Sequence, residues 1–458
     1  MKHCLVFILA GAACAFAAPP KPPASRVPPP VQLDLKTAEE IALRQSPTIS
    51  TAQFKALAAK QVVREVRSAF FPQITAEFSA VATGDDIAKE FGWHTFTNQD
   101  TRIGASGGLN NPTILSRESN GILFSQLITD FGRTWNLTEA AKSLALSEAD
   151  KSALARAKVL LLVDQTYFKA QQAQAVLRVA DETVMARQLI ADQVSALAQS
   201  QIKSELDASF ARVSLDEAKL LQLEARNRMD AAFADLSTAL GYAEPRKFAL
   251  MNIPRFPAPQ GNLASLIAQA LESRPEALSL RHQRDAARRT TSAERAAHFP
   301  KISLIGAAGR TTAGDPRVEG DYAAAGVNVE LPVFTGFRLS ARAKEAELQA
   351  QAAEQTLREM ENFIAQDVQV ALLNTTNTAD KITVTASLLA NAEQAYDLAE
   401  AKYNSGVTSL VEFSQAQLAK LQAQINHTTA TYEYQINRLV LDFQVGAPKY
   451  LNPTPRLH

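Results

Sequence analysis

Apolar and polar residues alternate with a period of two in several short stretches of this 458-residue chain. The pattern is clear in "QITAEFSAVA", which follows Pro72, and again from Val327 to Leu331. Such alternation predicts strands with one apolar and one polar face. Two strands are expected to open at Pro72 and Pro300, and two return strands over about Gly121–Thr129 and Tyr322–Val333.

Two much longer spans contain almost none of the residues that end helices. Residues 133–240 contain no Gly or Pro, and residues 337–445 contain only Gly406. Each span predicts a helix of roughly 65 residues, about 100 Å long, followed by a second helix. The breaks are expected near Ala198–Glu205 and Lys402–Ser409. The Ala-rich faces favour a bundle of antiparallel helices.

The chain repeats itself. "IALRQSPTIS" matches "QALESRPEAL", "SAFFPQIT" matches "AAHFPKIS", and "LITDFGR" matches "LPVFTGFR". Each half therefore reads helix, strand, strand, long helix, helix. The first helix is expected to begin near Thr37, which has capping-box spacing to Glu40, and its counterpart near Asn262.

These features divide the chain into six predicted segments. They are a signal peptide (1–17), a Pro-rich leader (18–33), a first repeat (34–241), a linker with four prolines (242–261), a second repeat (262–446) and a C-terminal tail (447–458). The leader should be extended and the linker mostly irregular. Polar loops are expected over Thr83–Asn120, which contains Trp93, and over Thr311–Asp321.

The N-terminus predicts secretion. Lys2 precedes an apolar run from Leu5 to Ala17 that ends in an A-x-A site, so cleavage is expected after Ala17. A lipoprotein signal is the competing interpretation, because Cys14 follows small residues. Cys4 and Cys14 are the two cysteines, so cleavage after Ala17 leaves no thiol for a disulfide.

Composition argues against several functions. Lys+Arg and Asp+Glu balance at 47 each, so the chain has no net positive charge that would attract nucleic acid. The six histidines are scattered without metal-ligand spacing, and no nucleotide-binding or nucleophile motif is present. We therefore expect no enzyme activity, no cofactor and no metal site.

Beyond the signal no apolar run reaches 18 residues, so membrane insertion would have to use the strands. About four strands cannot close a barrel, and an open edge in lipid is prohibitive. Several chains must then share one barrel, and three chains would supply about 12 strands. Glu77, Asn328 and Glu330 would face its interior, and the helices would continue it as a second hollow cylinder.

The chain resembles the TolC/OprM family of outer membrane efflux proteins from about Leu35 to Gly446. The resemblance rests on the duplication, the paired Phe-Pro strand starts, "PVFTGFR", "KYNSGVTSLVEF" and "NRLVLDFQVG". It implies a mainly α fold with β, a homotrimer, a 12-stranded outer membrane barrel and a periplasmic α-helical barrel. It also implies a periplasmic adaptor and an inner membrane pump as partners, together with outer membrane lipid.

The resemblance places functional residues at the tips of the two helical hairpins. Adaptor contact is expected at Gly406, Val407, Thr408 and Ser409. The repeat puts Gln201 where Gly406 stands, so the first tip departs from the pattern.

Asp207 and Glu412 occupy equivalent positions just past the tips. Threefold symmetry would gather them into an acidic ring that gates the channel and favours cations. Gln415 stands where the family carries a further acidic residue. The alternative is that Asp207 and Glu412 are ordinary solvated helix residues.

The function indicated is a passive exit duct for drugs or other small molecules in tripartite efflux. The same duct would serve type I protein secretion or metal-ion efflux. More remote alternatives are a periplasmic adaptor and a structural coiled coil, although neither accounts for the duplicated strand pairs.

Overall fold

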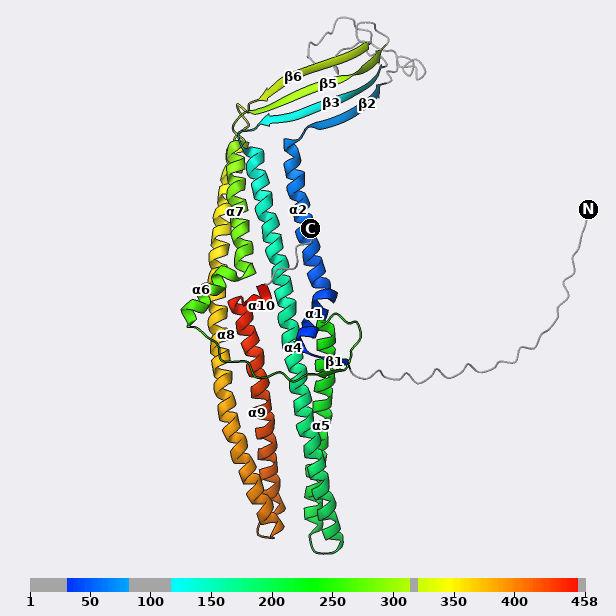
Figure 1. Ribbon diagram of the computed structural model, residues 1–458, viewed down its shortest axis with the longest axis vertical. Helices are drawn as coiled ribbons and strands as arrows, with labels where there is room; N and C mark the ends of the chain where they lie inside the picture. The colour runs from blue at the N-terminus through cyan, green and yellow to red at the C-terminus, as the bar shows by residue number, and fades with distance from the viewer. Residues whose placement is uncertain (1–30, 82–116, 314–319, 452–458) are drawn as a thin grey trace, which may run out of the picture.

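The computed structural model describes residues 31–81, 117–313 and 320–451, so the predicted signal peptide, most of the leader and Trp93 lie outside it. A small sheet occupies one end, and helices run from it to the far end (Figure 1). The long helices are α4 (Arg133–Gln199), α5 (Glu205–Ala239), α8 (Arg338–Asn404) and α9 (Leu410–Val445). The α4 and α8 helices contain 67 residues each, and both breaks fall where the sequence predicts them.

The sheet is antiparallel, with the order β2-β3-β5-β6. Its strands are β2 (Gln73–Val81), β3 (Arg117–Thr129), β5 (Lys301–Ala313) and β6 (Gly320–Glu330). The four strands are confirmed, but their limits differ from the prediction. The β3 and β5 strands extend into the predicted loops, because main-chain pairing continues to Arg117 and Ala313 regardless of side-chain polarity. The β6 strand ends at Glu330 rather than Val333.

The two faces of the sheet differ in polarity. Register places Ile74 and Phe78 of β2 on the same face as Val327 and Val329 of β6. These four side chains are all exposed, Phe78 to 81%. The opposite face is the more polar one and carries Glu77, Asn328 and Glu330, with Leu123 and Ile305 beside them. An apolar face left uncovered at this scale requires a partner or lipid.

Each predicted first helix is in fact two helices. These are α1 (Leu35–Gln45) and α2 (Pro47–Arg67) in the first repeat, and α6 (Leu263–Ser273) and α7 (Pro275–Ala296) in the second. The prolines cause the breaks, because the residue before a proline is driven out of helical conformation, as ψ of 117° at Ser46 and 129° at Arg274 shows.

The start of α1 corrects another prediction. Asp34 is the N-cap, and its carboxylate accepts a hydrogen bond of 2.9 Å from the Thr37 backbone N–H. The predicted Thr37 cap is therefore wrong by three positions, since aspartate is at least as good a cap as threonine. The predicted helix start near Asn262 is confirmed, and Asn262 is the N-cap of α6.

Strand and helix are joined by two consecutive residues of positive φ in each repeat. They are Phe131 (53°) and Gly132 (90°) before α4, and Gly336 (58°) and Phe337 (65°) before α8. This left-handed pair turns the chain from the sheet into the helix within a few residues. The phenylalanines accept a conformation that normally favours glycine.

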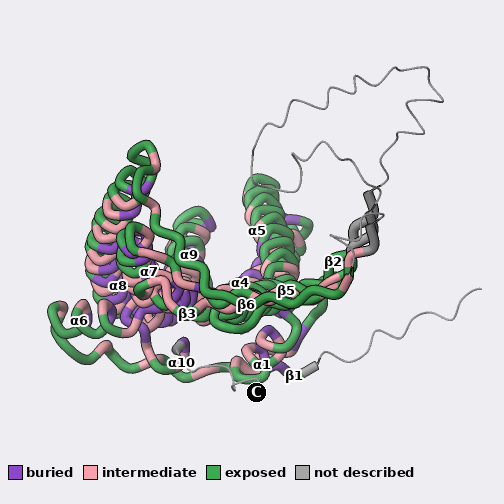
Figure 2. The backbone as a smooth tube through the Cα atoms, turned by 90° about the horizontal axis from the view of Figure 1, so that it is seen from above, coloured by how far each residue is buried: buried purple, intermediate pink, exposed green. Residues whose placement is uncertain are grey.

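A belt of short elements lies beside the helices at mid-length (Figure 1). The β1 (Val31–Leu33) and β4 (Phe248–Leu250) strands pair in parallel, so the leader and linker are partly ordered. The buried Tyr167 hydroxyl lies 3.0 Å from the Leu33 carbonyl oxygen and 2.8 Å from that of Met251. With α6 and α10 (Pro448–Leu451), these elements lie along one side of the helices (Figure 2).

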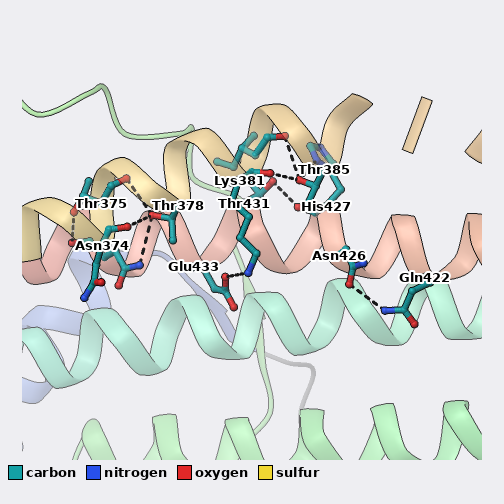
Figure 3. A network of polar contacts seen from close by, with 12 residues as sticks. Asn374, Thr375, Thr378, Lys381, Thr385, Gln422, Asn426, His427, Thr431 and Glu433 are labelled. Carbon is teal, nitrogen blue, oxygen red and sulfur yellow. Dashed lines mark hydrogen bonds and ion pairs between the residues drawn. The ribbon is translucent and has the colours of Figure 1, made fainter. Parts of the chain in front are cut away.

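The seam between α8 and α9 is more polar than its counterpart. Thr375, Thr378 and Thr385 are buried on α8 and bond to backbone carbonyls, and Lys381 bridges to Glu433 at 2.7 Å (Figure 3). The equivalent positions on α4 are alanines 170, 173 and 180. The two repeats therefore share the same arrangement of helices, but the side chains that pack between the helices differ in polarity.

Candidate gate at the helix tips

The two helical hairpins end in turns of the same geometry. Gln201 has φ of 61° and Gly406 has φ of 75°. Gln201 N–H donates to the Ala198 carbonyl at 3.0 Å, and Gly406 N–H donates to that of Tyr403 at 3.0 Å. The expected equivalence of Gln201 and Gly406 is confirmed, and glutamine occupies the left-handed conformation at a cost glycine avoids.

The four residues expected to meet an adaptor lie in the second turn. Gly406, Val407 and Ser409 are exposed, and Thr408 is half-buried. Val407 is 75% exposed and its counterpart in the first turn, Ile202, is 69% exposed. Each turn therefore exposes an aliphatic side chain to solvent, and Ile202 was not among the residues predicted to meet an adaptor.

Asp207 is held in a helix-capping motif. Its backbone N–H donates to Ser204 Oγ at 3.1 Å, and Ser204 Oγ donates to Asp207 Oδ2 at 2.8 Å. The Ser204 backbone N–H also points to the same carboxylate oxygen. Asp207 is thus the third residue of a capping box that starts α5.

Glu412 has the matching position at the start of α9. Its backbone N–H donates to Ser409 Oγ at 3.3 Å, and Thr408 Oγ1 donates to its carboxylate. Asp207 and Glu412 were predicted to be either gate residues or ordinary solvated helix residues, and neither prediction included helix capping. The signal was present in the sequence as Ser-x-x-Asp and Ser-x-x-Glu, spaced as a helix start.

The two tips contact each other within one chain. The Tyr403 ring stacks on Phe413 with centroids 5.1 Å apart, and Lys203 Nζ from the first tip lies 5.0 Å from the Tyr403 ring. Leu410 and Phe413 of α9 share a buried cluster with Val194 of α4. Cation–π contact and apolar burial therefore tie the hairpins together at this end.

Both signs of charge are present at the tips. Glu205 and Asp207 lie in the first turn of α5, and Glu412 lies in that of α9. Lys203 and Lys402 lie at the same tips, so acidic and basic side chains are close together there. Burial, then the nearby Asp207 carboxylate, raises the pKa of Tyr403.

Within the described ranges no group of three His, Cys, Asp or Glu side chains could hold a metal ion. None of the described helices is long and apolar enough to cross a membrane. Gln415 is exposed one turn past Glu412.

Comparison with known proteins gives the family. A family model described as outer membrane efflux protein matches residues 40–242 and 266–447, one match for each repeat. The chain therefore belongs to the outer membrane efflux protein family.

Three relatives illustrate the range of the family. The cation efflux system protein CusC of Escherichia coli (strain K12) is 27% identical over 74% of this chain and 76% of its own. Outer membrane protein TolC of Vibrio cholerae is 24% identical over 72% and 76%. The solvent efflux pump outer membrane protein SrpC of Pseudomonas putida is 27% identical over 65% and 64%.

Solved structures share the fold. A crystal structure of CusC has a TM-score of 0.76 at 21% identity, covering 91% of this chain and 93% of that one. The Campylobacter jejuni CmeC outer membrane channel has a TM-score of 0.75 at 18% identity, covering 90% and 85%. At such identities the likeness speaks for the fold alone.

Proposed function

We propose that three copies of this chain form an outer membrane exit duct that conducts small molecules passively. The observation that carries the proposal is the sheet. One face exposes Ile74, Phe78, Val327 and Val329, whereas the other carries Glu77, Asn328 and Glu330. Strands of 9 to 13 residues are long enough to cross a bilayer when tilted.

Closure sets the number of copies. One chain supplies four strands with two free edges, β2 and β6, and such edges are not tolerated in lipid. Three copies joined β6 to β2 give a closed barrel of about 12 strands. The helices, joined to the strands by the left-handed pairs, extend the same tube away from the membrane.

The remaining parts follow from this orientation. The tips lie at the far end from the sheet, where a periplasmic adaptor and an inner membrane pump would dock (Figure 1). Ile202 and Val407 offer an adaptor apolar contacts, and Asp207 and Glu412 would set the charge of the constriction. Transport energy would come from the pump, since the duct itself needs no catalysis.

Native mass spectrometry of the detergent-purified protein tests the assembly. The proposal expects a trimer recovered from the outer membrane fraction. Replacing Val329 and Val327 by Asp should prevent membrane insertion, because charge on the lipid face is costly. The matched variant Asn328→Asp, on the polar face, should insert normally. A monomer that stays water-soluble would refute the duct.

A further inference from the structure

A cavity of about 420 Å³ lies where the sheet meets the helices. Its walls are the ends of β2, β3, β5 and β6 nearest the helices, the end of α7, and the first residues of α4 and α8. Figure 1 shows where the sheet joins the helices. This volume is within the range of sites that hold small organic ligands.

The cavity lies on the polar side of the sheet. The strand residues that line it include Gln73, Ser125, Ser303 and Glu330, which register places on one face. The exposed apolar residues such as Val329 lie on the other. The inference rests on the proposed function for one point, that the polar face borders the conduit.

Four cationic side chains line the cavity: Arg133, Lys301, Arg338 and Arg342. Glu294, which is 7% exposed, holds two of them, with Oε1 at 3.0 Å from Arg342 Nη2 and 4.0 Å from Arg133 Nη2. The Arg133 Nε is buried and has no hydrogen-bond partner in the described structure. Among described contacts, Lys301 and Arg338 have no ion pair.

Two carboxylates also line the cavity, and one is already engaged. Asp130 Oδ2 accepts from the Thr134 backbone N–H at 2.8 Å and from the Thr134 hydroxyl, so it caps α4. Glu330 lies opposite Lys301 in the strand register, without an ion pair between them in the described contacts. Cations outnumber carboxylates in the wall.

The start of α8 adds further positive character. Thr335 stands where Asp130 stands in the first repeat, and the described contacts include no side-chain cap at the start of α8. The free N–H groups of a helix start attract anions. Arg338 and Leu339, the first two residues of α8, both line the cavity.

The rest of the wall is apolar. Phe71 and Phe299, the phenylalanines of the two Phe-Pro strand starts, line the cavity with Leu127 and Leu339. Phe299 is 56% exposed and its ring lies against Phe131, with centroids 5.6 Å apart. Apolar rings beside unpaired cations suit a ligand with an apolar body and an anionic group.

We propose that this cavity is a transit site for organic anions, meaning a carboxylate or sulfonate on an apolar body, with one site in each protomer. Lys301 and Arg338 bind the anionic group together with the start of α8. Phe71 and Phe299 contact the body. Inorganic anions such as sulfate carry the negative charge but lack the apolar body, so they bind weakly.

Equilibrium dialysis of 2-naphthalenesulfonate against the full chain in phosphatidylcholine nanodiscs tests the proposal, with empty nanodiscs as the blank. The double variant Lys301→Gln/Arg338→Gln should weaken binding about tenfold or more. The control Arg288→Gln/Lys344→Gln removes two cations from α7 and α8 outside the cavity, and should bind as the wild type does.

Three results would overturn it. They are equal binding to both double variants, binding of neutral 2-naphthalenemethanol as tight as that of the sulfonate, and displacement by sulfate at the same concentration as by the sulfonate. The dialysis needs no current, so it is read separately from any test of the conduit.

Discussion

The ammonium of Lys449 lies 2.7 Å from the carboxylate of Asp164, a residue of α4 that is fully buried. The same ammonium lies 2.7 Å from Glu39 of α1, and the Tyr450 hydroxyl donates to Asp164 at 2.7 Å. The C-terminal α10 is thereby tied to both α1 and α4. The sequence predicts only a tail there, because nothing local marks charges that meet across 285 residues.

Removing the cation should destabilise the belt. Lys449→Met leaves the buried Asp164 carboxylate without its counter-ion, and breaking such a pair costs about 3 kcal/mol. Thermal unfolding of the purified protein should therefore shift to lower temperature. The double variant Asp164→Asn/Lys449→Met should recover part of the loss, since no uncompensated charge remains. If Lys449→Met unfolds at the same temperature as the wild type, the ion pair with Asp164 does not contribute to stability.

Glu39 should make stability depend on pH. Burial, then the nearby Asp164 carboxylate, raises the pKa of Glu39 to about 7. The folded state therefore holds this proton more tightly than the unfolded state, so the stability it contributes is lost as pH rises through about 7.

Glu39→Gln should flatten that slope. At about pH 8 the variant should be more stable than the wild type, by on the order of 1 kcal/mol after allowance for solvent screening. At about pH 5 the two should melt together. Melting temperatures at the two pH values measure this, and an unchanged pH slope in the variant would refute the assignment.

The tips offer a test of backbone strain. Gln201 holds φ of 61° where the second tip has glycine, so Gln201→Gly should stabilise the first turn by about 1 kcal/mol. Slower amide exchange at Ile202, which bonds to Leu197, would report it. Ser200→Gly is the control, because Ser200 has an ordinary φ of −85° and should gain nothing.

Charge and capping can be separated at the gate. Asp207→Asn with Glu412→Gln removes the charges but keeps side-chain oxygens for the caps. Ser204→Ala with Ser409→Ala keeps the charges but removes the caps, at about 1 kcal/mol each. Cation preference, measured as a reversal potential, should fall in the first pair and persist in the second. Amide exchange at the tips should be faster in the second pair, which lacks the caps, and unchanged in the first.

If the cation preference is the same in all these proteins, Asp207 and Glu412 act only as helix caps. Their shared position in the two repeats would then reflect the helix starts alone.

Much of the architecture could be predicted because it depends on local patterns. The alternation of apolar and polar residues predicted the strands, and the long spans without Gly or Pro predicted α4 and α8. Because the sequence is duplicated, each element predicted in one half was supported by its counterpart in the other. The breaks at Ser46 and Arg274 were also local, since each precedes a proline. Pro47 and Pro275 belong to the matched segments, but only one helix was predicted there in each repeat.

What could not be predicted depends on distant contacts. The pairing of β1 with β4 joins three-residue stretches too short to show a period. The contact of Lys203 with Tyr403 joins two turns that are far apart in sequence. The basic cavity needs the ends of four strands and of three helices, α4, α7 and α8, so no single segment of the chain reveals it.

The most direct test of the central claim is single-channel conductance of the full-length protein, purified from the outer membrane and added to a planar lipid bilayer. The account predicts a long-lived pore of uniform conductance. A protein that inserts as a trimer yet passes no current under any voltage, or that never inserts, would contradict the exit duct.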